Sequence, residues 1–286
     1  MQATLALISA GILGGLAPIA VKIVLRELPP ITISFLRLTI ALLVLLPFSI
    51  RFFPQIVAHW KRLVLVGLFY SGNVFLFTLG IKHTTSAVSQ LLYGAVPLLM
   101  LLEQSVVGRV RLQTKQLMGI LLGIAGTLIV VAHPEQGFDF GARQGNMLIF
   151  FATISWSFYL VATKRLSQYV PTFGLTFAMS MVAWVIGLVL MSIFEAGAVM
   201  GLAALSTHAW FALLFVGLAV GVGMWLLYNF GIKHGSTVVA SSMLYVSMIT
   251  AGIAGYFVFG ETITSVFLFG GALLGSGVYL ISRKNS

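Results

Sequence analysis

The sequence predicts an all-α polytopic membrane protein with ten transmembrane helices, arranged as two inverted-topology five-helix repeats. Hydrophobic residues make up 59% of the 286 residues and charged residues only 8%, with a mean hydropathy of +1.08. A soluble domain carries roughly 25% charged residues, so the solvent of this chain is expected to be membrane lipid. Two further observations complete the prediction: basic residues gather on alternate loops, and the phrase GIKH occurs twice, at 80–83 and 231–234.

Charges, prolines and glycines divide the apolar runs into ten segments. Each spanning helix needs about 20 mostly apolar residues, so ten spans with short connections fill the chain. The spans are expected at approximately 3–25, 31–50, 62–80, 85–107, 114–132, 145–163, 171–194, 208–230, 236–258 and 264–282. No Lys or Arg precedes the first apolar run, so it is interpreted as a retained helix and not as a signal peptide.

The loops between these spans alternate in charge. One set, with the C-terminal end, holds eleven basic residues and no acidic one: Arg51, Lys61, Arg62, Arg109, Arg111, Lys115, Lys164, Arg165, Lys233, Arg283 and Lys284. The opposite set holds Lys22, Arg26, Lys82 and Arg143 with Glu27, Glu135, Asp139, Glu195 and Glu261. An excess of Lys and Arg marks the cytoplasmic side. We therefore expect a multi-pass protein of the inner (plasma) membrane with both termini in the cytoplasm, and no nucleic-acid partner despite the net charge of +10.

The repeated phrase ends the third span and again the eighth, five spans later. Because five is odd, the two copies are expected on opposite sides of the membrane. The sequence thus predicts a first repeat over 1–133 and a second, inverted repeat over 144–286. The last helix of each half also carries a GxxxG pattern, which is typical of close helix packing; the patterns are Gly119/Gly123 and Gly271/Gly275.

These residues resemble the drug/metabolite transporter superfamily, in its EamA-type ten-helix branch, over nearly the whole chain. The resemblance is carried by ITISFLRL with an early Arg37, by HTTSAVSQLLYGAVP, and by FGETITSVFLFGGALLGSGVYLI. The first half departs from the pattern, with GRVRL and Arg109 where the second half has GETIT. The second half lacks counterparts of Arg37 and Pro97. The resemblance implies a transporter, commonly an exporter of amino acids or metabolites, with a site that differs between the halves.

Inverted halves offer a route to alternating access around a site near the bilayer midplane. We therefore expect a secondary transporter, an exporter of a small organic solute such as an amino acid or related metabolite. A lipid or lipid-linked sugar flippase is the alternative, and would need a lateral opening with a basic patch. No catalytic constellation or phosphate-binding loop is present in the sequence, so neither an enzyme nor a cofactor is expected. His83 and His234 fall on opposite sides, so no metal site is expected.

Polar and aromatic residues inside the spans are the candidates for substrate binding: Asn73, Gln90, Tyr93, Trp156, Tyr159, Trp225, Ser242, Tyr245 and Arg37. Packing or anchoring is the alternative role for each aromatic. Gln90 and Tyr93 share a helix face at i, i+3 spacing, and Ser242 and Tyr245 repeat that spacing.

Two charges fall inside the spans, and intramembrane charges are functional candidates. Arg37 is expected about 9 Å deep at 1.5 Å per residue. It either snorkels to the outer headgroups or is tied to a loop acid such as Glu27, or it faces the cavity and attracts a carboxylate. Glu103, near the cytoplasmic end of its span, either pairs with a base such as Arg109 or couples transport to protons.

Overall fold

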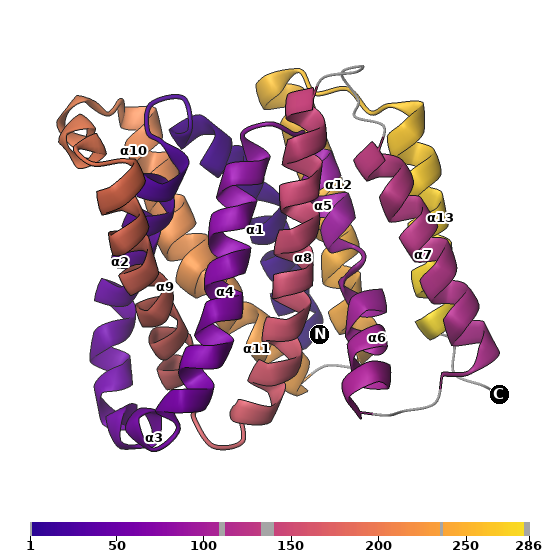
Figure 1. The fold of residues 1–286 in the computed structure, drawn as a ribbon, viewed down its shortest axis with the longest axis horizontal. Helices are drawn as coiled ribbons and strands as arrows, with labels where there is room; N and C mark the ends of the chain where they lie inside the picture. The colour runs from indigo at the N-terminus through magenta and orange to yellow at the C-terminus, as the bar shows by residue number, and fades with distance from the viewer. Residues whose placement is uncertain (1, 109–111, 133–139, 235–236, 283–286) are drawn as a thin grey trace.

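The computed structural model describes residues 2–108, 112–132, 140–234 and 237–282, and they form helices and no strand (Figure 1). The spans are α1 (Gln2–Val24), α2 (Pro30–Ser49), α4 (Trp60–Ile81), α5 with α6 (Ser86–Tyr93 and Val96–Gly108), α7 (Thr114–Ala132), α8 (Phe140–Leu166), α9 (Thr172–Phe194), α10 with η3 and α11 (Thr207–Leu214, Phe215–Met224 and Trp225–His234), α12 (Thr237–Phe259) and α13 (Ser265–Ser282). Short helices η1 (Ile50–Phe52), α3 (Phe53–Ala58) and η2 (Ala198–Ala204) lie in the connections.

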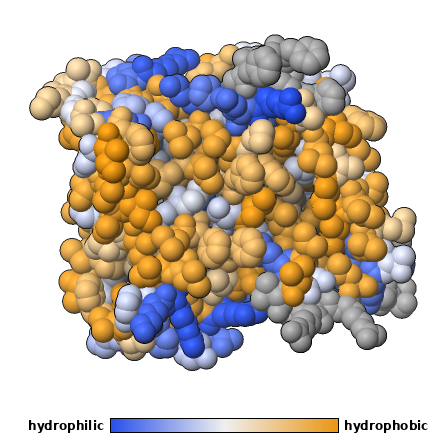
Figure 2. Space-filling view, viewed as in Figure 1, coloured by the Kyte–Doolittle hydropathy of each residue, from blue (hydrophilic) through white to orange (hydrophobic). Residues whose placement is uncertain are grey.

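These elements confirm the ten-helix membrane fold. In the described part of the chain, eight helices are long and apolar enough to cross a membrane, and the apolar helices Met243–Phe259 and Ser265–Ile281 are shorter. The molecular surface agrees, because hydrophilic residues gather along two opposite edges with a hydrophobic belt between them (Figure 2). Large apolar side chains on the spans, such as Leu43 on α2 and Phe257 on α12, are exposed, as lipid-facing residues are.

Two spans are interrupted near their middle. The fourth breaks between α5 and α6 at Gly94 and Ala95, where Pro97 lacks the N–H that a continuous helix would use. The eighth changes from α-helix to the π-helix η3 and back to α-helix at Trp225. Such departures from α-helix are frequent at functional sites, and both lie beside residues of the candidate site.

Helices of the first and second halves of the chain pack against each other throughout. The principal pairings are α1 with α12 and with the α10–η3–α11 span, α8 with α4 and the α5–α6 span, α2 with α9, and α7 with α13. When each of the first five spans is exchanged with the span five positions later in the chain, this set of pairings stays the same. The packing therefore has the exchange symmetry expected of two related halves.

The α7–α13 pair at one edge of the molecule (Figure 1) packs through glycines. A Cβ added to Gly277 would lie 2.4 Å from the Gly119 carbonyl oxygen and 2.8 Å from the Gly123 nitrogen. The prediction of close packing is thus confirmed for the α7 pattern, Gly119/Gly123. In the α13 pattern, a Cβ on Gly271 would lie 3.3 Å from Leu91 of α5, so this glycine also packs closely, whereas the prediction is wrong for Gly275, where a Cβ would meet nothing within 4 Å. The face of α13 toward α7 carries Gly270 and Gly277 instead.

Candidate functional site

Five aromatic side chains from three helices form one continuous cluster, called here the aromatic cluster: Tyr70, Trp156, Tyr159, Trp225 and Tyr228. Trp156 stacks on Tyr159 with ring centroids 4.9 Å apart and lies 5.0 Å from Trp225. Tyr159 lies 5.3 Å from Tyr70, and Trp225 lies 6.0 Å from Tyr228. Tyr70, Tyr159 and Trp225 are buried, whereas Trp156 and Tyr228 keep partial accessibility. Helices α4, α8 and α11 are joined by these rings.

A polar group adjoins the aromatic cluster at Tyr70. The Asn73 side-chain amide donates to the Tyr93 hydroxyl and to the Ala152 carbonyl, the latter at 3.1 Å. This links α4 both to α5 and to α8. Arg37 of α2 lies beside the hydroxyls of Tyr70 and Tyr93. Together, Arg37, Asn73 and Tyr93 are called the polar group below.

Both parts of the site lie deep in the spans. Arg37 follows Pro30 by seven residues, which is about 10 Å at 1.5 Å per residue in a core about 30 Å thick. Its guanidinium is desolvated by surrounding protein, yet the residue keeps partial accessibility. The guanidinium therefore lies inside the protein, beside the hydroxyls of Tyr70 and Tyr93. No carboxylate of the described residues lies within 4.0 Å of it.

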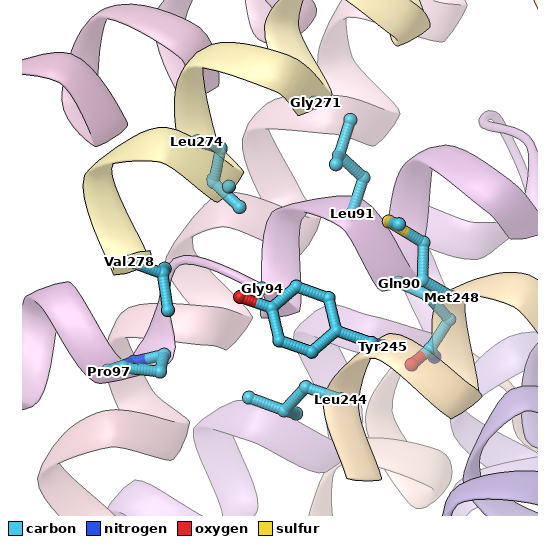
Figure 3. A pocket seen from close by; sticks show the side chains of 11 residues that line it. Gln90, Leu91, Gly94, Pro97, Leu244, Tyr245, Met248, Gly271, Leu274 and Val278 are labelled. Atoms are coloured by element: carbon cyan, nitrogen blue, oxygen red, sulfur yellow. The ribbon is translucent and has the colours of Figure 1, made fainter. Parts of the chain in front are cut away.

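Gln90 and Tyr245 lie elsewhere. They line a hollow between α5, α12 and α13, with apolar walls that include Leu91, Leu244 and Met248 (Figure 3). Tyr245 is 40% exposed and belongs to neither the aromatic cluster nor the polar group. Gln90 and Tyr93 therefore have different neighbours, although their spacing places them on one side of α5. The Ser242 side chain falls outside the described part of the structure.

Glu103 lies on α6 with its Oε2 atom buried. Neither Oε2 nor the buried Ser157 hydroxyl on α8 has a hydrogen-bond partner in regular geometry among the described atoms, although the two side chains interact. Arg109, the base expected to pair with Glu103, lies outside the described residues.

The other three described carboxylates join the two halves of the chain at one face, called here the acidic face. Glu261 accepts from the Lys22 ammonium at 2.5 Å, from the Ser86 backbone N–H at 2.8 Å and from the Ser86 hydroxyl at 3.2 Å. Ser86 is the first residue of α5. A carboxylate at this position satisfies an unpaired N–H and favours the positive end of the helix dipole.

Glu195 and Glu27 make equivalent ties. Glu195 accepts from the backbone N–H groups of Ile31 and Thr32 at 3.1 and 2.7 Å, at the start of α2. Glu27 accepts from the Ser206 backbone N–H at 2.7 Å and from its hydroxyl at 2.5 Å, ahead of α10. The Ser206 hydroxyl and backbone bonds lower the pKa of the Glu27 carboxyl. Glu27 is thus committed to Ser206 and does not serve as the partner of Arg37.

Two members of the aromatic cluster, Tyr70 and Tyr228, were not among the residues expected from the sequence. A signal for both was present: Tyr70 precedes Asn73 by three residues, and Tyr228 follows Trp225 by three. This is the i, i+3 spacing that places side chains on one helix face.

Comparison with known proteins identifies the family. The model of the EamA-like transporter family matches residues 1–132 and again 143–283. An uncharacterized transporter of Archaeoglobus fulgidus is 24% identical over 254 residues, covering 89% of this chain and 87% of the relative. A protein of Salmonella typhimurium described as a probable amino-acid metabolite efflux pump is 29% identical over 281 residues, covering 93% and 90%. A crystal structure with 20% identity and a TM-score of 0.68 covers 98% of this chain and 96% of its own, and shows the same fold. This chain belongs to the EamA-like transporter family.

Proposed function

We propose that this protein is a secondary transporter that exports a small organic solute, such as an amino acid or related metabolite, across the inner membrane. The observation that carries the proposal is the composition of the deep site. Helices α2, α4 and α5 of the first matched segment supply Arg37, Tyr70, Asn73 and Tyr93, while α8 and α11 of the second supply the remaining rings. A solute held there contacts both halves, as alternating access between two repeats requires.

Two findings support the two-repeat architecture on which this mechanism rests. The family model matches the chain twice, over 1–132 and 143–283, and the helix pairings keep their pattern when the halves are exchanged. Each repeat has an odd number of spans, so the second repeat is inverted relative to the first. Exchanging the tilts of the two repeats then turns access from one side of the membrane to the other.

The ties at the acidic face support a conformation in which the path between the halves is closed on that side. Lys22 with Glu261, Thr32 with Glu195, and Ser206 with Glu27 each join one half of the chain to the other. Opening a path between the halves on this face separates these partners. Because basic residues predominate in the opposite loops, we assign the acidic face to the outside and the closed gate to the outer side.

The Salmonella relative is described as an amino-acid metabolite efflux pump, which supports export of an amino-acid-like solute. The flippase alternative gains no comparable support. The hollow beside Tyr245 opens between helices, but among the described residues its lining is Gln90 and Tyr245 with apolar side chains, and none of these is a Lys or Arg. A lipid phosphate would have no basic partner there.

Counterflow in proteoliposomes tests the proposal. Vesicles carrying the purified protein and loaded with unlabelled L-phenylalanine or L-threonine are given the same labelled solute outside, and the panel is extended to the remaining amino acids and their deaminated acids. We expect saturable, transient accumulation of at least one solute. Trp156→Ala should lower the rate at least tenfold, because it removes the centre of the aromatic cluster. Trp210→Ala, at a residue 39% exposed on α10, should leave the rate near that of wild type. Absence of counterflow for every solute, or equal effects of the two tryptophan variants, would refute the proposal.

A further inference from the structure

Arg37 is a buried cation without a fixed counter-charge among the described residues. No described carboxylate lies within 4.0 Å of it, and the polar groups beside it are the phenolic hydroxyls of Tyr70 and Tyr93. A guanidinium has five N–H donors in a planar fork that matches a carboxylate. Two hydroxyls cannot occupy that fork as a carboxylate can. An uncompensated cation at this depth is unfavourable, so an anion that reaches the guanidinium when the two halves open is bound favourably.

The site offers no equivalent for a cationic group. Of the four described carboxylates, Glu27, Glu195 and Glu261 are bonded to helix starts at the acidic face. Glu103 is 17 residues beyond Ser86 along the α5–α6 span, whereas Arg37 is seven residues below Pro30, which separates them in depth by about 15 Å. An α-ammonium group is bonded to the same carbon as the carboxylate in an amino acid, so Glu103 is out of its reach when Arg37 holds the carboxylate.

Packed aromatic rings continue from Arg37 toward α8. Tyr70 touches both Arg37 and the ring of Tyr159, whose centroid lies 5.3 Å away, and Trp156 with partial accessibility continues the series. Aromatic rings gain from offset or edge-to-face packing with another ring. A molecule with a carboxylate at one end and an apolar or aromatic body at the other matches the order of groups from Arg37 to Trp156.

We infer that Arg37 binds the carboxylate of the transported solute, and that the solute class is small monocarboxylates with an apolar or aromatic body, bound as anions and with no fixed acid for an ammonium group. The inference rests on the proposed function and narrows it. Arg37 provides charge and orientation, Tyr70 and Tyr93 border the carboxylate, and the aromatic cluster receives the body. An α-amino group adds a desolvation cost that no described carboxylate offsets.

Equilibrium binding to the purified wild-type protein at pH 7 tests the charge preference directly. The probes share one phenylethyl body: 3-phenylpropionate, its amide 3-phenylpropionamide, L-phenylalanine and phenethylamine. Ligand binding raises the apparent thermal stability by mass action, and calorimetry gives the dissociation constants. We expect 3-phenylpropionate to bind at least tenfold more tightly than the amide and than L-phenylalanine, with phenethylamine weakest. Equal binding of acid and amide, tighter binding of L-phenylalanine, or no binding of 3-phenylpropionate would overturn the inference.

Substitutions assign the preference to Arg37. Arg37→Gln should reduce the acid-to-amide ratio to near one, while Arg37→Lys, which keeps the charge but loses the planar fork, should weaken the acid severalfold and preserve the preference. Arg143→Gln, an exposed arginine on α8, is the matched control and should change neither constant. A preference for the acid that survives in Arg37→Gln would exclude Arg37 as the binding group. If Arg37→Gln does not fold, the Arg37→Lys result and the wild-type ligand series decide.

The binding test of Arg37 and the transport test of the proposed function can fail independently of each other. Binding is measured at equilibrium in detergent and requires no transport, whereas counterflow with a panel of solutes requires no preference for acids. Counterflow of amino acids without tight binding of 3-phenylpropionate would sink the inference and leave the transporter proposal standing. Tight, Arg37-dependent binding without counterflow of any solute would refute the transporter proposal and leave Arg37 as a carboxylate-binding residue of a protein that does not transport these solutes.

Discussion

The tie among Lys22, Glu261 and the start of α5 gives a quantitative prediction. Glu261 is 8% exposed and Lys22 18% exposed, so the pair is largely withdrawn from solvent. Glu261→Gln leaves the Lys22 ammonium without its partner but keeps one amide oxygen for the Ser86 N–H. Removing one member of a buried ion pair costs about 3–5 kcal/mol. Because part of the capping bond survives, we expect a loss of about 3 kcal/mol in the free energy of unfolding.

The complementary substitution, Lys22→Met, should lower the free energy of unfolding by less than Glu261→Gln does. In Lys22→Met the Glu261 carboxylate keeps both bonds from Ser86, at 2.8 and 3.2 Å. Hydrogen bonds to a charged group contribute about 1.5–3 kcal/mol. We therefore expect Lys22→Met to lower the free energy of unfolding by an amount near the lower limit of that range. The double variant has no unpaired charge and should lose less than the sum of the single losses, with an interaction free energy of about 2 kcal/mol.

The assay is reversible unfolding in mixed detergent micelles, followed by tryptophan fluorescence. Lys82→Gln, at an exposed lysine of the same face, is the control and should lie within about 0.5 kcal/mol of wild type. The reasoning is refuted if the two single losses add in the double variant, or if Glu261→Gln is as mild as Lys82→Gln.

Three further predictions concern packing and buried polar groups. Gly277→Ala places a Cβ 2.4 Å from a backbone oxygen of α7 and should lower the free energy of unfolding by about 1–3 kcal/mol. Gly275→Ala, with open space around it, should leave the free energy of unfolding unchanged or raise it by up to about 1 kcal/mol through helix propensity. Equal unfolding free energies of the two variants would contradict the assigned α7–α13 interface. Tyr93→Phe removes an acceptor of the Asn73 amide and should cost about 1 kcal/mol in unfolding, and an unchanged stability would show that this bond contributes nothing. Glu103→Gln replaces a buried carboxylate oxygen that lacks a regular partner and should be neutral or stabilising, so a loss above about 2 kcal/mol would reveal a fixed cationic partner.

The ten spans could be predicted because their signal is local. Length and hydropathy of each segment decide whether it crosses a bilayer, and the span boundaries at 31–50 and 114–132 agree with α2 and α7 to within one residue. The break at Pro97 also follows from local chemistry, since proline lacks the required N–H.

The ties of the acidic face could not be predicted, because their partners are far apart in sequence. Glu195 and Thr32 are separated by 163 residues, and Glu27 and Ser206 by 179. A glutamate in a loop gives no local signal of which helix start it will meet. The sequence therefore left Glu27 open as a partner of Arg37, whereas the structure bonds it to Ser206.

The grouping of the candidate site residues could not be predicted from the sequence. Helical spacing indicates which residues share a face, but it does not indicate which helix that face meets. Tyr93 meets Asn73 of α4, while Gln90 shares a hollow with Tyr245 of α12. The same limit applies to α13, where the interface uses Gly277 and not the GxxxG pattern two residues earlier.

Access to the deep site from the two sides of the membrane tests the central claim most directly. The chain contains no cysteine, so Tyr93→Cys introduces a single thiol beside Arg37 without any background reaction. A membrane-impermeant methanethiosulfonate reagent is applied to sealed vesicles of each orientation. Leu43→Cys, at a side chain that is 69% exposed and lies within the α2 span, serves as the lipid-facing control. Alternating access predicts that Cys introduced at position 93 reacts from both sides, and that adding Glu261→Gln raises the rate from the acidic face severalfold. Reaction from one side alone, with a rate that Glu261→Gln leaves unchanged, would contradict the account.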